Sequence, residues 1–401
     1  MDMLQRFGRV AITVALAVSF CEAQWVQTAS SPKGSGITDL EVKQSNGYLY
    51  ATTGSFNWPN GDTGGVHRST NRGDTWTRVF PANIGRTIEV KSNGLIFASV
   101  RPLTNEGLHY SSNDGQTWNV ALDVGPSNNI FSIAFDTLFG RNTVYAGSRL
   151  GVHRNLAGGI AGFWTIGSIG LPGAPYVRDL VVSPYGQVIA AVQNPFQPWT
   201  NGVYYSTNQG ETFLGTSGIQ QSDTIVSLAV AVDSSTLSPL PTVYLIAGAS
   251  NGNVWRAVIT NAFVIGTFQL VHIFAGRPEI ARLRFLQFAH LVYAALFATV
   301  SPFGGIYYSA MFGSPWAPII LGLPAVLAMS ALAYYQDPID ASRPYTLYSG
   351  LFLNQNNGAP VYRLTLTTDV GEIGQTPSSF ALEQNYPNPF NPTTTIHYSL
   401  P

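Results

Sequence analysis

Ser69-Thr70-Asn71-Arg72-Gly73-Asp74-Thr75-Trp76 is the stretch that decides the fold, because it returns twice further along the chain. The other copies are residues 111–118 (SSNDGQTW) and residues 206–213 (STNQGETF). In each copy a short polar side chain can fold back onto the amides of a tight turn, and a glycine accommodates a positive φ. These turn positions are therefore expected to be structural. They are Asn71, Gly73, Trp76, Asn113, Gly115, Trp118, Asn208, Gly210 and Phe213.

A strand pattern accompanies these turns and recurs seven times. It consists of an aliphatic residue, then an aromatic residue or histidine, then arginine or tyrosine. The copies begin at Val66, Leu108, Val152, Val203, Val254, Ile306 and Val361. Their spacing of roughly 40–55 residues, with alternating strands between them, is typical of propeller blades. The sequence therefore predicts an all-β fold, a seven-bladed β-propeller of four-stranded antiparallel blades over residues 24–370. Only three units keep the turn sequence, and units three, five, six and seven are expected to have lost it.

The two ends of the repeat region predict how the ring closes. The last unit ends its third strand near Leu366 and has no fourth strand, whereas Trp25-Val26-Gln27 matches Trp76-Thr77-Arg78 in an outer strand. We therefore expect residues 25–28 to pair with the last blade as its outer strand. This closure would remove the open sheet edges that otherwise invite aggregation.

The three turn sequences resemble the Asp box, also called the BNR repeat, of sialidase-like β-propellers, whose pattern is S-x-D-x-G-x-x-W. Asparagine replaces the aspartate in all three copies, and Phe213 replaces the tryptophan once. Asparagine can still make the turn, so the resemblance supports the fold. It implies almost nothing about function, because the box itself is structural.

Residues 380–396 (FALEQNYPNPFNPTTTI) resemble the opening of the type IX secretion sorting domain of Bacteroidetes-like bacteria. The resemblance implies export through the outer membrane by the type IX secretion machinery, often with attachment to the cell surface. The family's domain continues for several more strands, whereas this sequence stops at Pro401. We therefore expect residues 380–401 to be a truncated start of that domain, joined to the propeller by a linker over residues 371–379.

Residues 1–23 are interpreted as a signal peptide. Two arginines precede the apolar stretch 10–20, and small residues allow cleavage after Ala23. The alternative is lipidation of Cys21, which Phe20 disfavours. Since Cys21 is the only cysteine, the mature chain would lack disulfides, thiol catalysis and cysteine-bound metals. The protein is therefore expected to be secreted, or attached to the outer surface of a Gram-negative bacterium.

Composition narrows the possible partners. Twenty basic and 21 acidic residues give a net charge of -1 without any charged block, which argues against nucleic acid and anionic membranes as partners. The uncharged stretch 317–335 is long enough for a membrane span, but prolines and the repeat pattern divide it into a strand, a turn and a strand. We expect a monomer with no membrane span in the mature chain, no cofactor and no metal.

One polar position recurs in the innermost predicted strands. Its members are Asp39, Thr87, Ser132, Asp179, Ser227, Arg282 and Ser330. These side chains are expected to hydrogen-bond backbone groups between neighbouring inner strands. His67, His109 and His153 recur in the third strand, so they too are expected to be structural rather than metal ligands.

The candidate binding face follows from the alternating direction of the strands. The start of the first strand lies at the same end of a blade as the loop between strands two and three. Arg86, Arg178 and Arg282 therefore share a face with two aromatic loops that carry Trp58 and Trp199. Such aromatic rings suit stacking on sugars or on side chains of a protein partner. The alternative is that both tryptophans pack on their own loops.

Catalysis stays open at this point. The sialidase resemblance implies an arginine triad, a Tyr–Glu pair and an aspartate, but the early arginine motif is absent and no Tyr–Glu pair can be assigned. Xyloglucanase-like propellers use two aspartates, and the corresponding catalytic candidates are Asp39 and Asp179. Their blades are expected to lie far apart around the ring.

The leading hypothesis is a non-catalytic recognition or scaffold module for a glycan or a surface protein. The alternative is a glycoside hydrolase of sialidase-like or xyloglucanase-like type.

Overall fold

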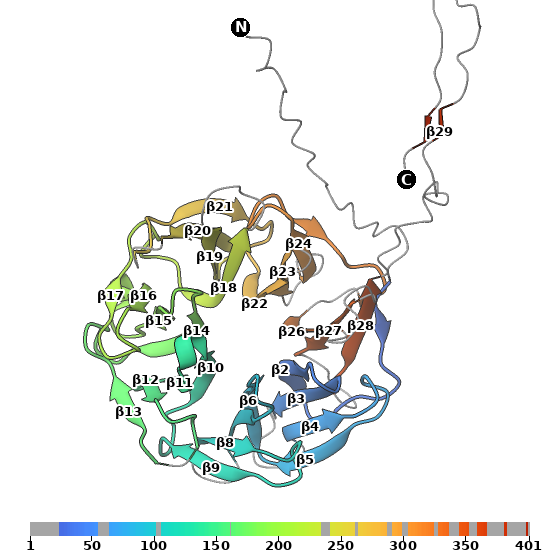
Figure 1. Cartoon of the computed structure of the whole chain (residues 1–401), viewed down its shortest axis with the longest axis horizontal. Coiled ribbons are helices and arrows are strands. Elements are labelled where there is room, and N and C mark those ends of the chain that lie inside the picture. Colours follow the sequence, from blue (N-terminus) through green and yellow to red (C-terminus); the bar gives the residue numbers. More distant parts are fainter. Residues whose placement is uncertain are drawn as a thin grey trace, which may run out of the picture.

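Seven sheets of four antiparallel strands surround a central axis, as predicted (Figure 1). The computed structural model describes residues 24–54, 64–101, 106–160, 162–233, 241–260, 264–286, 291–298, 304–324, 328–336, 345–352 and 359–366, and the short segments 381–382 and 398–399. The expected signal peptide and linker lie outside these residues, as does most of the expected sorting domain.

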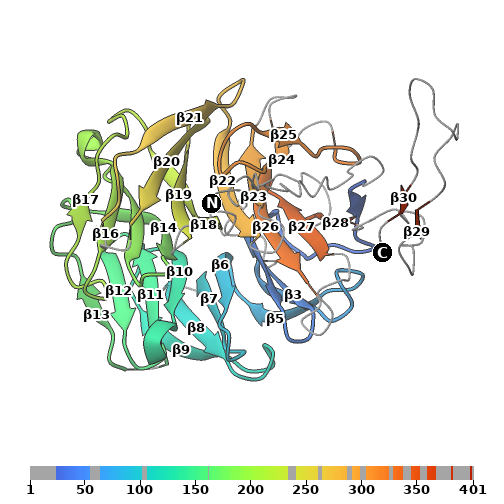
Figure 2. The same ribbon diagram turned by 45° about the horizontal axis from the view of Figure 1, so that its top comes forward.

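Each blade runs from an inner strand at the axis to an outer strand at the rim. Blades one to four are β2 (Gly36–Lys43), β3 (Tyr48–Gly54), β4 (Gly65–Ser69), β5 (Thr77–Pro81); β6 (Ile84–Val90), β7 (Ile96–Arg101), β8 (Gly107–Ser111), β9 (Asn119–Asp123); β10 (Ile130–Asp136), β11 (Thr143–Ser148), β12 (Gly151–Asn155), β13 (Thr165–Gly167); and β14 (Tyr176–Val182), β15 (Val188–Gln193), β16 (Gly202–Ser206), β17 (Leu214–Gly215). Blades five to seven are β18 (Ile225–Asp233), β19 (Thr242–Ala249), β20 (Asn253–Ile259), β21 (Gln269–Ile273); β22 (Glu279–Leu286), β23 (Leu291–Phe297), β24 (Gly305–Ser309), β25 (Ala317–Pro318); and β26 (Met329–Tyr335), β27 (Tyr345–Leu351), β28 (Val361–Leu366), β1 (Val26–Gln27). Figure 2 shows the outer strands β9, β13, β17 and β21 on the rim.

Burial changes from strand to strand within a blade. The second strands are almost continuously buried, as in β11 and β27, because both of their faces pack against neighbouring blades. The outer strands are more exposed, as in β5. Seven hydrophobic clusters result, and each lies between two adjacent blades. The core is therefore a ring of interfaces around the axis.

The ring closes as the sequence predicts. Val26 pairs with Arg363 and Gln27 pairs with Tyr362, so the N-terminal strand β1 is the outer strand of blade seven. The Trp25 side chain is 1% exposed, and its Nε1 donates to the carbonyl oxygen of Ile319 in blade six at 2.7 Å. Trp25 thus joins the first described residues of the chain to its last two blades.

The three predicted turns share one set of hydrogen bonds. In blade one, Asn71 Oδ1 accepts from the Thr75 amide at 2.9 Å, and Ser69 Oγ accepts from the Gly73 amide at 2.8 Å. Equivalent bonds form in the turns of blades two and four. The glycine φ is +94° at Gly73, which explains why glycine is required there.

Blade six also keeps this turn, although we expected it to be lost there. Ser309 Oγ accepts from the Gly313 amide at 3.1 Å, and Trp316 Nε1 donates to the Gly313 carbonyl oxygen at 2.7 Å. Met311 stands where the other turns have asparagine. The serine, glycine and tryptophan are therefore sufficient for the turn conformation.

The described residues contain two short 3-10 helices, η1 (Leu138–Gly140) and η2 (Pro198–Thr200), and no helix long and apolar enough to cross a membrane. The uncharged stretch 317–335 contributes β25 and β26, as expected. In the tail, β29 (Ala381–Leu382) pairs with β30 (Tyr398–Ser399).

Candidate functional site

All seven inner strands carry a β-bulge at the same place, one residue before the recurrent polar position or, in blade seven, on it. The bulged residues are Thr38, Arg86, Phe131, Arg178, Val226, Ala281 and Ser330. All seven line one axial pocket with a volume of about 300 Å³. A bulge bends its strand and redirects a side chain. The repeated bulge therefore builds the pocket.

Blade seven corrects the predicted polar position by one residue. Met329 pairs with Leu351 and Ala331 pairs with Gly350, so Ser330 is the bulged residue and Ala331 occupies the polar position. This shift cannot be read from the sequence, because Ser330 is polar and the residue at the true polar position, Ala331, is not. Ser330 consequently lines the pocket, and its Oγ donates to the carbonyl oxygens of Ile37 and Gly350.

The pocket wall is asymmetric. Blades two, three and four contribute Arg86, Phe131 and Arg178. All three side chains are large, and the two arginines are cationic. The bulged residues of the other four blades are small or medium-sized, so they leave the room that the pocket occupies. Phe297 and Phe352, at the ends of β23 and β27, also line it. The pocket therefore lies at the end of the ring where inner strands begin and second strands end.

The two wall arginines differ in their partners. The Arg86 Nε donates to Glu106 Oε1 at 2.6 Å, and the Glu106 side chain is 1% exposed. Arg178 makes no ion pair or hydrogen bond with any residue that the structure describes. Both guanidinium groups lie over the Phe131 ring, Arg86 at 5.8 Å and Arg178 at 5.2 Å from its centroid. Burial lowers the pKa of Arg178, as do the charges of Arg86 and Arg149, while Glu279 opposes this effect.

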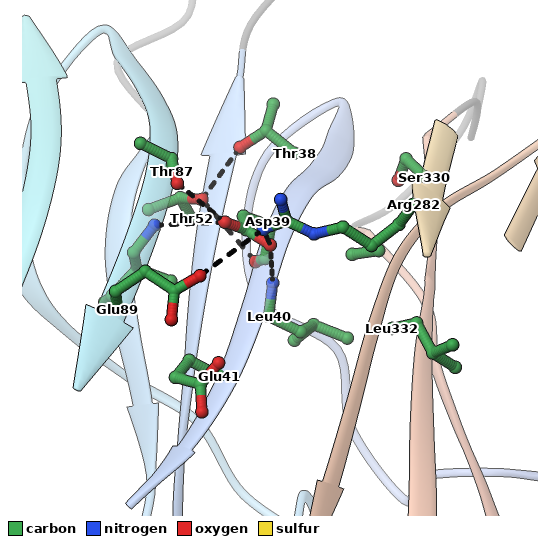
Figure 3. Close-up of polar contacts among 12 residues, drawn as sticks. Thr38, Asp39, Leu40, Glu41, Thr52, Thr87, Glu89, Arg282, Ser330 and Leu332 are labelled. Atoms are coloured by element: carbon green, nitrogen blue, oxygen red, sulfur yellow. Dashed lines mark hydrogen bonds and ion pairs between the residues drawn. The ribbon is translucent and has the colours of Figure 1, made fainter. Parts of the chain in front are cut away.

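Arg282 forms the floor of the pocket. Its guanidinium pairs with Asp39 and lies 3.9 Å from Glu89 (Figure 3). It also lies 4.0 Å from Asp179. Deeper in the axis, Arg284 Nη2 contacts Glu41 at 3.3 Å and Glu89 at 3.1 Å. Burial and the neighbouring Glu89 charge raise the pKa of Glu41 to about 8.

Blades one and four lie apart around the ring, as expected, but their aspartates Asp39 and Asp179 do not. Since one guanidinium reaches both carboxylates, they lie within the limit of about 10 Å for a hydrolytic pair. The reason is geometric. Inner strands from all seven blades converge at the axis, so blades that are distant along the rim meet there.

The hydrogen bonds of both aspartates nevertheless have the structural pattern expected for the polar position. Asp39 Oδ2 accepts from the Ile88 amide of blade two at 3.2 Å, and Asp179 Oδ2 accepts from the Leu228 amide of blade five at 2.7 Å. Ser227 Oγ likewise accepts from Leu283 of blade six at 2.7 Å. These three side chains join blade one to two, four to five and five to six, whereas Thr87 donates to Asp39 and the buried Ser132 Oγ has no hydrogen-bond partner among the described residues. Asp39 and Asp179 are also only 2% and 6% exposed.

The other candidates lie nearer the solvent. Trp199 belongs to η2, in the connection between β15 and β16 at the pocket end of the ring, and is 60% exposed. Phe196 in the same connection is 73% exposed, so neither ring packs down on the loop. Trp58 lies outside the described residues.

The histidines lie away from this site and are buried in third strands, as predicted. Burial lowers the pKa of both His67 and His153 to about 4, so both are neutral at neutral pH. No group of three potential metal ligands occurs among the described residues.

Three pocket features escaped the sequence analysis. Phe131 is the bulged residue of blade three, and comparing the residue before the polar position across all units would have revealed it. Glu106, which pairs with Arg86, precedes the third strand of blade two and follows no repeat pattern. Glu279 begins an inner strand three residues before Arg282, where no other unit has a carboxylate.

Comparisons with known proteins support the fold and leave the function open. The sequence matches no known protein-family profile and no curated protein. Among solved structures, the GH74 xyloglucanase from Xanthomonas campestris is 17% identical with a TM-score of 0.56, covering 83% of this chain and 54% of the xyloglucanase. This chain therefore spans about half of that enzyme. YCF48 from Cyanidioschyzon merolae is 15% identical with a TM-score of 0.55, covering 86% of this chain and 99% of YCF48. The RRP9 WD40 repeats are 12% identical with a TM-score of 0.57, covering 85% and 97%.

Proposed function

We propose that this protein is an exported, non-catalytic recognition module that binds an acidic group of a glycan or protein ligand at its axial pocket. The observation that carries the proposal is Arg178, a half-buried guanidinium that lines the pocket without an ion-pair partner among the described residues. A partly buried cation without an ion-pair partner is costly, and an anionic ligand would supply that partner. The Arg178 guanidinium lies over the Phe131 ring, 5.2 Å from its centroid, and this cation–π contact positions it.

The surroundings of the pocket suit a larger ligand. Trp199 and Phe196 are exposed at the same end of the ring and offer flat apolar surfaces. Aromatic faces of this kind bind sugar rings and apolar side chains. The ligand would insert its acidic group into the pocket while the rest lies across these rings. Propellers of the same fold include a xyloglucanase and a YCF48 structure solved with a D1 peptide.

Export is part of the proposal and comes from the sequence alone. The signal peptide over residues 1–23 and the tail resembling a type IX sorting domain both support a secreted or surface-attached location. A surface location brings the pocket into contact with extracellular glycans and proteins.

The test is an array of acidic and neutral glycans together with acidic peptides. We expect acidic ligands to bind the wild type and Arg178→Met to weaken them at least about tenfold, since a charge-assisted hydrogen bond is lost. Arg256→Met is the matched control, because Arg256 contacts the blade-six turn at the opposite end of the ring. Equal binding by wild type and Arg178→Met would contradict the proposal.

A second function, glycoside hydrolysis, has one observation in its favour. Arg282 brings Asp39 and Asp179 together, and burial raises the pKa of Asp179, as a general acid requires. Against it, both carboxylates already accept backbone hydrogen bonds, and Asp39 also accepts from Thr87 Oγ1 at 2.8 Å. A broad glycosidase screen decides between the two functions. Turnover that disappears in Asp179→Asn would establish the hydrolase.

A further inference from the structure

We propose that the axial pocket binds a zwitterionic group, with the carboxylate of the ligand on Arg178 and its ammonium on Glu279. The ligand class is therefore an amino acid with a short aliphatic spacer, or a larger molecule that ends in one. This inference rests on the proposed function, since it uses the same pocket and the same arginine. It adds a second recognition element that an acidic ligand alone would not use.

Glu279 is the second unpaired charge of the pocket. It begins β22 in blade six and lines the pocket, yet it forms no ion pair or hydrogen bond with the described residues. Burial raises its pKa, and only the charge of Arg178 lowers it. The other charges of the lining are satisfied, because Arg86 pairs with Glu106 and Arg282 pairs with Asp39. One cation and one carboxylate therefore face the same space without a close partner.

Arg178 and Glu279 influence each other without touching. Each shifts the pKa of the other, but they do not approach to the distance of an ion pair. Two opposite charges that share a pocket and stay apart leave a gap for a group that carries both complementary charges. A simple anion would satisfy Arg178 and place a second negative charge near Glu279. A zwitterion satisfies both.

The wall between the two charges is apolar. Arg178 belongs to blade four and Glu279 to blade six, and the bulged residues that follow Arg178 around the ring are Val226 and Ala281. These two side chains offer a surface for methylene groups and no hydrogen-bonding atoms. The ligand is thus expected to have a hydrocarbon spacer between its charges. A volume of about 300 Å³ is at the small end of ligand pockets, which suits one amino-acid-sized group.

The experiment uses a series of ω-amino acids that differ only in spacer length, from glycine through β-alanine, 4-aminobutyrate and 5-aminopentanoate to 6-aminohexanoate. Isothermal titration calorimetry measures the dissociation constant of each with the wild-type protein. We expect one spacer length to bind best, because the two charges are fixed on different blades. The N-acetyl derivative of that compound, which lacks the ammonium, is expected to bind about tenfold more weakly.

Two variants assign the contacts. Glu279→Gln keeps the size of the side chain and should abolish the difference between the free and N-acetylated compounds. Arg178→Met should abolish the binding of both. Glu211→Gln, at an exposed glutamate near the rim of blade four, is the matched control and should change neither affinity. Thermal unfolding of each variant verifies that it is folded.

The zwitterion proposal is overturned if the N-acetyl derivative binds as tightly as the free amino acid, or if Glu279→Gln leaves the preference intact. It is also overturned if no member of the series binds while acidic ligands of the array do. In these cases the recognition of an acidic group stands, because it depends on Arg178 alone. Loss of array binding as well would overturn both proposals.

Discussion

The side chains at the recurrent polar position of the inner strands take on different roles although their positions are equivalent. Asp39, Asp179 and Ser227 all accept amide hydrogen bonds from the next blade, and the sequence predicts this from the recurrence of polar residues. Arg282 occupies the same position, but its guanidinium has only hydrogen-bond donors and cannot accept from an amide of the next blade. It crosses the axis to Asp39 instead. The sequence could place all four residues on one ring, but which of them meet depends on side-chain length at the axis.

Glu41 should make the stability of the protein depend on pH. Its pKa is about 8 in the folded protein against an ordinary value of 4.5, because burial and Glu89 disfavour its charge. Between these values the folded state binds more protons than the unfolded state, so stability falls as pH rises from about 5 to 8. Glu41→Gln should remove part of this decline, on the order of 2 kcal/mol, as measured by urea unfolding at several pH values.

The matched control for this experiment is Glu211→Gln. The Glu211 side chain is 59% exposed and lies 3.8 Å from Arg154, so its replacement should leave the slope of stability against pH unchanged. If Glu41→Gln and Glu211→Gln have the same slope as the wild type, Glu41 is ionised in the folded protein throughout this range and the prediction is wrong.

At the scale of the element, the turn between strands three and four depends on fewer residues than its sequence signature indicates. Blades one, two and four combine Ser, Asn and Gly, and blade six keeps only Ser309 and Gly313 before Trp316. A search for Asn or Asp at the third position misses blade six. A search for Ser-x-x-x-Gly-x-x-Trp would have found it, so this part of the fold was within reach of the sequence.

Pro315 explains the missing asparagine. In blade one the side-chain oxygen Oδ1 of Asn71 accepts from the backbone amide four residues later, at Thr75. The corresponding residue in blade six is Pro315, which has no amide hydrogen to donate. An asparagine at position 311 would lack this partner and would keep only a bond from the serine hydroxyl, as Asn71 accepts from Ser69 at 2.9 Å, so little favours it over methionine.

Substitutions in the turns of blades one and six test this account. Ser309→Ala should destabilise the protein by about 1 kcal/mol, as Ser69→Ala should in blade one, because each removes the acceptor of a glycine amide. Met311→Asn should bring no gain. Met311→Asn combined with Pro315→Thr should recover the bond and stabilise the turn relative to Pro315→Thr alone. Chemical denaturation measures all five variants, and a gain from Met311→Asn by itself would contradict the account.

At the scale of the whole molecule, the ring form follows from the count of seven units and the missing fourth strand of the last one. Both are readable in the sequence, and pairing of Val26 with Arg363 confirms them. The pocket is different. Its lining comes from seven bulges, and a bulge depends on the local pairing of two strands. Charge marks Arg86 and Arg178 in the sequence, and Phe131 can be read from its place before the polar position, whereas Glu279 requires the structure.

Closure through Trp25 should be a major source of stability. Trp25→Ala removes a fully buried side chain and its bond to Ile319, at a cost of about 3–5 kcal/mol. It also loosens β1 from β28, whose free edge can then pair with other chains. Trp118→Ala is the matched control, since Trp118 caps blade two without closing the ring. Urea unfolding and light scattering should show a larger loss of stability, and aggregation, only for Trp25→Ala.

A circular permutant separates closure from the loss of a large side chain. Residues 24–31 are moved to follow residue 366 through a copy of the blade-one turn, residues 70–75, so that blade seven has the same connectivity as blade one. If pairing of β1 with β28 is what closes the ring, the permutant should keep the stability and oligomeric state of the parent chain of residues 24–366. Removal of residues 24–31 without regrafting should give aggregation.

Because every interface in the ring joins neighbouring blades, opening the ring at blade seven exposes both the β28 edge and the blade-six surface that Trp25 covers. A deletion variant as stable as the parent would show that the other six interfaces hold the ring closed by themselves.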